Sequence, residues 1–109
     1  MAKNPEFLYL TTTGWKTGKS HEIEIWYVDY EGCYYLVAEH RERSHWVQNI
    51  HHNPRITVTV GDKSFEGTGR VVDPAVDTAL AAAVSTLMDR KYRWSDGLIV
   101  ELKPLSRKE

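Results

Sequence analysis

The stretch from Thr11 to Ser20, with the sequence TTTGWKTGKS, carries the clearest chemical signal in the chain. Its glycines and threonines can present backbone N–H and hydroxyl donors, while Lys16 and Lys19 add positive charge. Such a combination can hold a phosphate group through charge-assisted hydrogen bonds, without a helix terminus. The same residue types are common in hairpin loops, so the residues alone favour a phosphate-binding loop and a plain polar loop about equally.

Tryptophan is the second signal, because the chain has four tryptophans in 109 residues. Trp26, Trp46 and Trp94 each stand beside polar or charged neighbours, in EIWYV, SHWVQN and KYRWSDG. Aromatic side chains in such places can wall a flat cofactor while their polar edges meet water. Packing in a core or at a dimer interface is the commoner role for any one of them.

Other kinds of site chemistry are not indicated by the sequence. His45, His51 and His52 would share one short helix, but His51 and His52 are adjacent and so point about 100° apart. No His-x-x-x-His spacing joins them, and we expect no metal site. The chain has no Gly-x-Ser-x-Gly motif, Walker loop or dinucleotide fingerprint. Glu22 and Glu24 could act as an acid–base pair, although solvated carboxylates are the simpler interpretation.

The residue patterns place these side chains on a mainly β fold with two helices. Strands are predicted at 7–13, 21–30, 33–39, 55–60, 63–72 and 97–104. A short helix is predicted over 44–53, with Ser44 as its N-cap and Asn53-Pro54 at its end. A longer amphipathic helix is predicted to start at Asp73-Pro74. Its apolar stripe would be Val76, Leu80, Ala83, Val84 and Leu87. Six sequential strands with hairpin connections favour an antiparallel sheet closed into a small barrel.

The bulk properties limit the possible partners. A chain of 109 residues with 41% hydrophobic and 27% charged residues predicts one folded domain over 1–109. The net charge of −1 gives no global field that would recruit nucleic acid or an anionic membrane. No apolar run approaches the ~20 residues of a membrane span, and the amino-terminal segment lacks an apolar signal core, so we expect a cytosolic protein. Cys33 is the single cysteine and is predicted to be a small packing residue.

Three segments carry a family resemblance: LTTTGWKTGK, the hairpin that ends in YYLVA, and HWVQNIHHNPRITVTVGDKSFEGTGRVV. Together they resemble the deazaflavin-dependent nitroreductase family. That family belongs to the split β-barrel group, which also contains the flavin proteins that resemble pyridoxamine-phosphate oxidase. The resemblance runs from about Leu8 to Leu102. Its most specific part is the tryptophan-x-x-asparagine helix from Trp46 to Asn49.

The resemblance implies a homodimer of split barrels, each with six antiparallel strands and a deazaflavin (coenzyme F-420) or FMN in a groove near the interface. Such proteins pass a hydride to a quinone, nitroaromatic or activated alkene, so the cofactor supplies the reactivity and the protein positions it. The implied cofactor-binding residues are Thr12, Thr13, Lys16, Thr17, Trp26, Val37, Ala38, Arg41, Trp46 and Asn49. Tyr92 is implied as the proton donor and Trp94 as a wall of the substrate site.

The chain departs from the family pattern at Trp15 and His21, where relatives commonly carry arginine, and at Glu24, where they carry proline. Arg41 and Arg43 are expected to restore positive charge from a neighbouring loop. These departures keep FMN as an alternative cofactor. They also keep two alternative functions: a split-barrel protein that binds FMN, heme or another planar ligand without turnover, and a structural dimer without a ligand.

Overall fold

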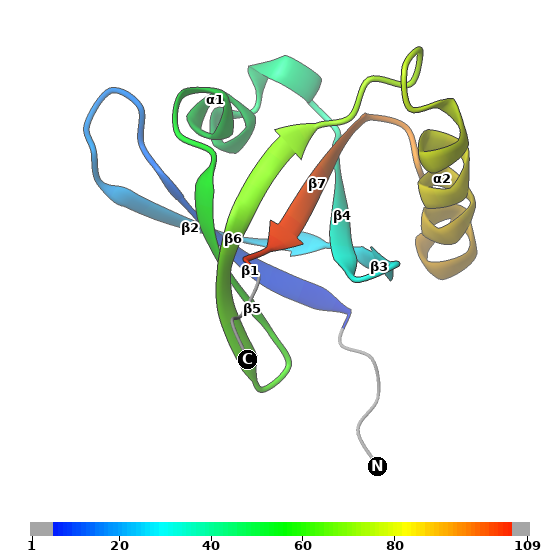
Figure 1. Ribbon diagram of the computed structural model, residues 1–109, viewed down its shortest axis with the longest axis horizontal. Coiled ribbons are helices and arrows are strands. Elements are labelled where there is room, and N and C mark those ends of the chain that lie inside the picture. The colour runs from blue at the N-terminus through cyan, green and yellow to red at the C-terminus, as the bar shows by residue number, and fades with distance from the viewer. Residues whose placement is uncertain (1–5, 106–109) are drawn as a thin grey trace.

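The computed structural model describes residues 6–105 and shows a curled antiparallel sheet with two α-helices (Figure 1). The strands are β1 (Phe7–Thr13), β2 (Ser20–Trp26), β3 (Val28–Tyr30), β4 (Cys33–Ala38), β5 (Arg55–Val60), β6 (Lys63–Val71) and β7 (Leu98–Pro104). The helices are η1 (Arg41–Arg43, a 3₁₀ helix), α1 (His45–His52) and α2 (Thr78–Tyr92). The strand order is β2-β1-β5-β6-β7-β4-β3, which confirms the predicted mainly β, antiparallel split-barrel fold with two helices.

The strand predicted over 21–30 is two strands, so the prediction of six strands was one too few. The break falls at Tyr27, which joins β2 and β3 although these lie at opposite edges of the sheet. Side chains of α2 form hydrogen bonds with the Tyr27 backbone. The Tyr27 N–H donates to the Tyr92 hydroxyl (3.1 Å), and the Tyr27 carbonyl accepts from that hydroxyl and from Lys91 Nζ (both 2.9 Å). Because these partners lie outside the sheet, the chain can cross from one edge to the other at this residue.

The inward side chains of the strands form the core of the barrel, and α1 covers one end of it. Val47 and Ile50 of α1 are buried against this core. The helix begins and ends as predicted, after Ser44, whose carbonyl accepts the N–H groups of Val47 and Gln48 (both 3.1 Å), and before Asn53. The Ser44 hydroxyl makes no capping hydrogen bond. This helix therefore holds the tryptophan-x-x-asparagine motif at the mouth of the barrel.

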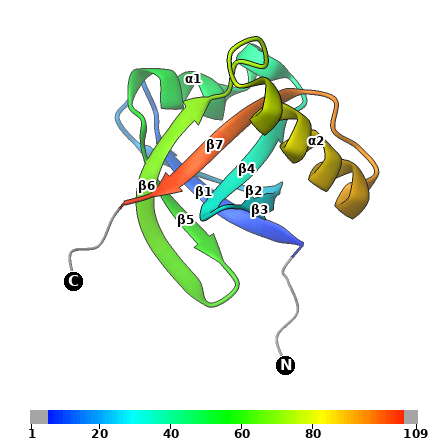
Figure 2. The same cartoon turned by 45° about the vertical axis from the view of Figure 1, so that its right-hand side comes forward.

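The second helix, α2, packs on the outer face of the sheet over β3, β4 and β7 (Figure 2). Its buried residues are Ala81, Val84 and Met88. The helix starts at Thr78 and not at Pro74, because Asp73 organises a separate turn: its carboxylate accepts the Ala75 N–H (2.9 Å). Val76 consequently lies outside the helix and is 76% exposed, so its predicted place in the apolar stripe was wrong.

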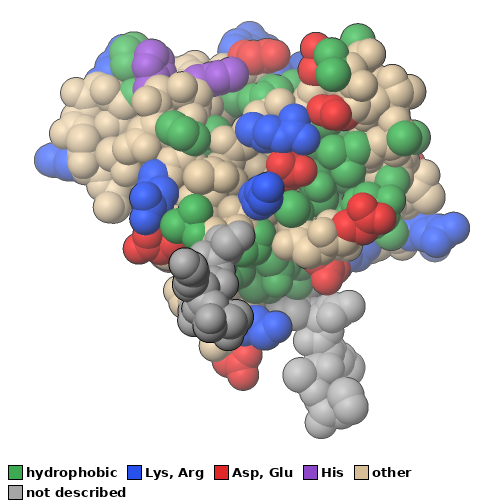
Figure 3. Space-filling model, viewed as in Figure 1, with side chains coloured by type: hydrophobic (Ala, Val, Ile, Leu, Met, Phe, Trp, Pro, Cys, Tyr) green, Lys and Arg blue, Asp and Glu red, His purple; other side chains and the backbone are tan. Residues whose placement is uncertain are grey.

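Charged and apolar side chains are interspersed on the face that carries β6 and β7 (Figure 3). Arg70 forms ion pairs with Glu101 (2.8 Å) and Asp77 (3.1 Å), and Glu101 also accepts the Tyr35 hydroxyl (2.8 Å). Cys33 packs beside this network, and burial raises the pKa of its thiol. Within residues 6–105, no helix is long and apolar enough to cross a membrane, and no group of three or more potential metal ligands occurs.

Candidate functional site

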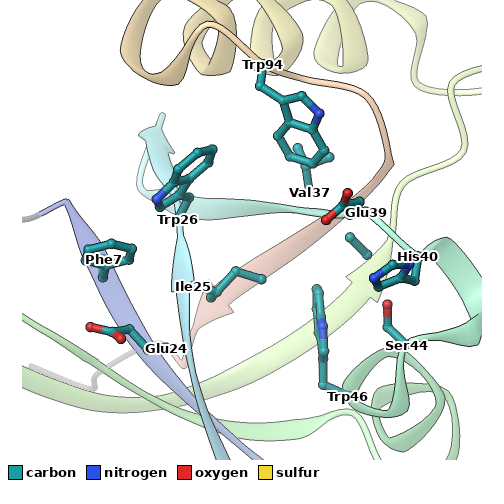
Figure 4. Close-up of a pocket in the computed structure, with 11 residues that line it drawn as sticks. Phe7, Glu24, Ile25, Trp26, Val37, Glu39, His40, Ser44, Trp46 and Trp94 are labelled. Carbon is teal, nitrogen blue, oxygen red and sulfur yellow. The ribbon is translucent and has the colours of Figure 1, made fainter.

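The curled sheet is open between β2 and the end of β4 that carries Val37 and Ala38, because β3 pairs with β4 only at residues 33–35. A pocket of about 570 Å³, the seam pocket, lies along this opening (Figure 4). Its lining residues are Phe7, Glu24, Ile25, Trp26, Val37, Ala38, Glu39, His40, Ser44, Trp46 and Trp94. The pocket therefore combines aromatic walls with a few polar side chains, as small-molecule sites commonly do.

The aromatic walls of the seam pocket are held in place by packing. Trp26 is stacked on Tyr92, with ring centroids 4.4 Å apart and planes 7° apart. Trp94 meets the ring of Trp26 edge-on, with centroids 6.2 Å apart. Trp46 comes from α1 and faces the same space. Such offset and edge-on contacts fix the rings, so the pocket offers flat apolar surfaces to a ligand.

Peptide groups that point away from the neighbouring paired strand line both sides of the seam. The Gly14 N–H donates to the Lys19 carbonyl (2.7 Å), which fixes the β1–β2 register so that the N–H and C=O of Glu24 and Trp26 point away from β1. On β4, the Tyr30–Cys33 pair closes a two-residue turn, and the same alternation directs the peptide groups of Val37 away from β7. The polar edges of a flat ring can pair with these groups.

A second pocket of about 470 Å³, the loop pocket, continues along the same strand edge. It is lined by Thr12, Gly14, Trp15, Lys16, Thr17, His21, Glu22, Ile23, His45, Trp46, Gln48 and Asn49. Trp46 lines both pockets, and Glu22–Ile23 of the loop pocket directly precede the β2 residues of the seam pocket. The two pockets therefore form one groove.

The loop between β1 and β2 is fastened to α1 by Asn49, which is 6% exposed. Its Oδ1 accepts the Trp15 N–H (3.2 Å), and its Nδ2 donates to Thr12 Oγ1 (3.0 Å). The Trp15 ring stacks on His52 with centroids 4.3 Å apart, and Lys16 Nζ lies 5.0 Å from the centre of the Trp15 ring. Thr12 and Asn49 thus position the loop, and Lys16 is left at the surface of the groove.

The structure brings most of the predicted site residues to this groove. The loop pocket holds Thr12, Lys16, Thr17 and Asn49, the seam pocket holds Trp26, Val37, Ala38 and Trp94, and Trp46 belongs to both. Trp15 and His21, which stand where relatives carry arginine, also line the loop pocket.

Thr13, Arg41 and Tyr92 line neither pocket. Arg41 forms an exposed ion pair with Asp96 (3.1 Å). The Tyr92 hydroxyl lies behind Trp26, within hydrogen-bonding distance of the Tyr27 backbone and of the Glu6 carbonyl (2.6 Å), and burial raises its pKa. This hydroxyl is engaged with backbone groups, which favours a structural role over proton donation.

The sequence did not single out Phe7, Glu39, His40, Ser44, His45 or Gln48 as site residues, although all six line the groove. Glu39 and His40 directly follow β4, whose Val37 and Ala38 were predicted to lie along the ring. Their position next to Val37 and Ala38 in the chain was the sequence signal that could have identified Glu39 and His40. Phe7 gave none, because its place depends on how β1 lies against the seam.

The charges of the groove change along its length. The loop pocket holds Lys16 with Glu22, His21 and His45, whereas the seam pocket holds Glu24 and Glu39 with His40 and is lined by no lysine or arginine of the described residues. The Glu24 carboxylate accepts the Tyr9 hydroxyl (3.1 Å), and this hydrogen bond raises the pKa of Tyr9. An anionic group is therefore favoured at the loop end and disfavoured at the seam end.

Solved structures with the same architecture place the chain in the class of split-barrel folds. An F420-H2 dependent reductase (FDR-A) is 22% identical, with 94% of this chain and 98% of that chain covered and a TM-score of 0.64. The heme storage protein HutZ from Vibrio cholerae is 16% identical, with 94% and 83% covered and a TM-score of 0.74. An FAD-binding protein from Mesorhizobium loti is 11% identical, with 94% and 83% covered and a TM-score of 0.72. At these identities the likeness shows the fold alone.

The family follows from the sequence itself. Residues 1–95 match the family described as F420H(2)-dependent quinone reductase, and the chain belongs to that family. Membership supports the predicted oxidoreductase class and F-420, rather than FMN, as the cofactor. No curated protein matches the sequence.

Proposed function

We propose that this chain is an oxidoreductase that passes a hydride from reduced coenzyme F-420 to a quinone. The observation that carries the proposal is the groove itself, in which a tryptophan-walled apolar pocket opens into a pocket with Lys16. A flat ring with a phosphorylated tail needs both parts, joined end to end. The two pockets fit such a molecule in lining chemistry and in order along β2.

In the proposed complex, the residues of the groove bind, orient and exclude water. The reduced deazaflavin supplies the hydride when it is bound. Trp26, Trp46 and Trp94 would enclose the ring and displace water from it, and the Val37 peptide group would pair with its polar edge. Aromatic walls that displace water in this way orient the reacting groups and strengthen polar contacts beside them.

The charge pattern favours one orientation of the cofactor. Lys16 and the hydroxyl of Thr17 would hold the phosphate through charge-assisted hydrogen bonds, with His21 and His45 nearby. Glu24 and Glu39 would disfavour that anionic group in the seam pocket. Thr12 and Asn49 would act by positioning the loop, and Thr13 and Arg41 would contribute through their neighbours rather than by contact.

A second candidate function is the binding of a planar ligand such as heme or FMN without turnover. The shared fold with a heme storage protein and the imidazole of His40 in the seam pocket support this alternative. Nitroaromatics and activated alkenes are further acceptors that the same hydride transfer would serve. A cytosolic location stays a prediction.

We also propose that the protein works as a homodimer. Phe7 and Tyr9 are 36% and 41% exposed on the outer face of β1, and Phe7 borders the seam pocket. Large aromatic side chains exposed beside a binding groove are typical of interfaces. A second copy that covers this face would also close one side of the groove.

Titration of the purified protein with F-420, FMN and hemin tests these functions. Quenching of tryptophan fluorescence by F-420, followed by oxidation of reduced F-420 with menadione, is the expected result. A Soret band with hemin and no oxidation of reduced F-420 would favour the non-catalytic alternative. Absence of binding by all three ligands would contradict both.

A further inference from the structure

Reduction of a quinone by hydride requires a proton donor, and Tyr92 is badly placed for that role. Its hydroxyl is occupied by the backbone of Tyr27 and by the Glu6 carbonyl, and its ring lies behind Trp26. A protein group that donates this proton would therefore have to be another side chain that faces the seam pocket. This inference rests on the proposed function.

The titratable side chains that line the seam pocket are Glu24, Glu39 and His40. Glu24 already accepts a hydrogen bond from the Tyr9 hydroxyl. Carboxylic side chains in general have no proton to give at neutral pH, whereas imidazole loses and regains a proton in that range. Among these three residues, histidine has the chemistry of a general acid.

The backbone of His40 is fixed although its side chain is exposed. His40 is the residue before η1, and its carbonyl accepts the Arg43 N–H (3.0 Å). Arg41, the next residue, has a φ of 52° and pairs with Asp96 on the segment that precedes β7. Figure 4 shows the imidazole of His40 on the rim of the seam pocket beside Ser44, with Trp26 on the opposite side. The imidazole of His40 can therefore face a bound acceptor and exchange protons with solvent.

Several charged groups surround this imidazole. Glu39 precedes it on the chain, Glu24 faces the pocket from β2, and Arg43 and His45 share with it an adjoining hollow of about 470 Å³. A pH effect therefore has to be assigned by comparing histidine variants.

We propose that the protonated imidazole of His40 is the catalytic acid that donates a proton to the reduced quinone. The quinone accepts a hydride, with its two electrons, from the reduced cofactor and becomes a hydroquinone monoanion. Transfer of the imidazolium proton to the anionic oxygen forms the O–H bond of the neutral hydroquinone and leaves His40 neutral. When bound, the reduced cofactor would supply the hydride and, in total, one proton to solvent. His40 would take one proton up from solvent, so protons and electrons would balance over a turnover.

The first test compares His40→Gln with the matched control His51→Gln, which changes an exposed histidine of α1 outside both pockets. Menadione reduction by reduced F-420 is followed from about pH 5 to about pH 8, where imidazole titrates. We expect kcat of the wild type to fall as the pH rises through this range. His40→Gln should lower kcat at low pH by up to about 10²-fold, the lower end of general acid catalysis, and lose the pH dependence. His51→Gln should behave like the wild type.

The adjoining His45 provides the assignment control. His45→Gln removes a side chain of the loop pocket and is expected to weaken F-420 binding. If His40 is the acid, the pH dependence of kcat persists in this variant. Loss of the pH dependence in His45→Gln and its retention in His40→Gln would overturn the proposal.

The second test uses the protein without cofactor and needs no turnover. The anion 2,4-dinitrophenolate stands in for the hydroquinone monoanion, and its binding is read by quenching of tryptophan fluorescence. Lys16→Ala and His45→Gln, which change the loop pocket, serve as controls and should leave the pH dependence of this binding in place. We expect wild-type affinity to fall as the pH rises, because neutral His40 no longer attracts the phenolate. His40→Gln should bind it more weakly at low pH and without pH dependence.

The two proposals fail in different ways. A wild type that turns over, together with a His40→Gln variant of equal kcat and pH profile, overturns the role of His40 and leaves the proposed function intact. Dinitrophenolate binding that His40→Gln does not alter also overturns it. A wild type that oxidises no reduced F-420 with any quinone removes the proposed function, and the role of His40 with it.

Discussion

Replacing Tyr92 with phenylalanine removes one oxygen atom from the corner where the chain crosses between the sheet edges. The aromatic ring, and with it the 4.4 Å stacking on Trp26, is retained. The Tyr27 N–H loses its acceptor at 3.1 Å, whereas the Tyr27 carbonyl keeps the Lys91 ammonium group at 2.9 Å. The substitution therefore leaves one buried backbone donor without its partner. The Glu6 carbonyl, which lies 2.6 Å from the same hydroxyl, belongs to an exposed residue and can accept a hydrogen bond from water instead.

The size of the effect follows from this single orphaned group. A buried donor that loses its hydrogen bond costs about 1–3 kcal/mol of unfolding free energy. Tyr92 is half-buried, so we expect the lower part of this range, about 1–2 kcal/mol. In a domain of this size, each kcal/mol corresponds to about 4–8 °C in Tm.

Urea unfolding followed by tryptophan fluorescence measures the loss, with Tyr30→Phe as the matched control. Tyr30 packs in the same cluster, but its hydroxyl makes no hydrogen bond with any other described residue. The control should change the unfolding free energy by less than about 0.5 kcal/mol. Menadione reduction by Tyr92→Phe should remain within a few-fold of the wild type, because the hydroxyl faces backbone groups rather than the seam pocket.

The opposite pattern would refute this reasoning. If Tyr92→Phe unfolds like the wild type but loses most of its kcat, then the hydroxyl acts in catalysis and not at the corner. Equal unfolding free energies for Tyr92→Phe and Tyr30→Phe would also show that the Tyr27 N–H finds another partner.

Three further substitutions test the groove. Lys16→Ala should raise the Kd for F-420 about tenfold to a hundredfold, which is the contribution of one charge-assisted hydrogen bond. The control Lys63→Ala, at the β5–β6 turn, should leave this Kd unchanged. Equal Kd values for the two variants would remove Lys16 from the site. Asn49→Ala removes the hydrogen bonds from Asn49 to the Trp15 N–H and to the Thr12 hydroxyl. The variant should lose about 2 kcal/mol of unfolding free energy and bind F-420 more weakly. Unchanged urea unfolding would contradict the positioning role of Asn49. Gly97→Ala places a Cβ 2.5 Å from the Ala38 carbonyl oxygen. The unfolding free energy should therefore fall by about 1–3 kcal/mol and Tm by several degrees. A wild-type melting curve would show that these two segments do not approach each other tightly.

Local patterns predicted the elements that depend on local interactions. The hairpin of β5 and β6 could be predicted because two alternating runs flank Gly61-Asp62, and Val60 pairs with Lys63 as expected. The start and end of α1 could also be predicted from neighbouring residues, namely Ser44 before the helix and Asn53-Pro54 after it. These signals lie within a few residues of the elements that they define.

Contacts between distant segments explain what the sequence did not show. The break at Tyr27 depends on Tyr92, 65 residues away, so an alternating pattern across 21–30 carried no sign of it. The same contact holds the hydroxyl of Tyr92, the predicted proton donor, against the Tyr27 backbone, and Tyr92 lines neither pocket. His40 reaches the seam pocket because the chain turns after β4 into η1, which no local pattern predicted.

The corner at Tyr27 also has a consequence for the order of folding. The β1–β2, β3–β4 and β5–β6 hairpins each close between neighbouring segments, whereas the corner needs residues 27 and 92 to meet. Contacts between distant residues carry a larger loop-closure cost, and we expect this corner to form after the folding transition state. Changes at Tyr92 should then accelerate unfolding and leave the folding rate nearly constant. The lifetime of the folded chain, and with it the shape of the groove, would thus depend on the last turn of α2.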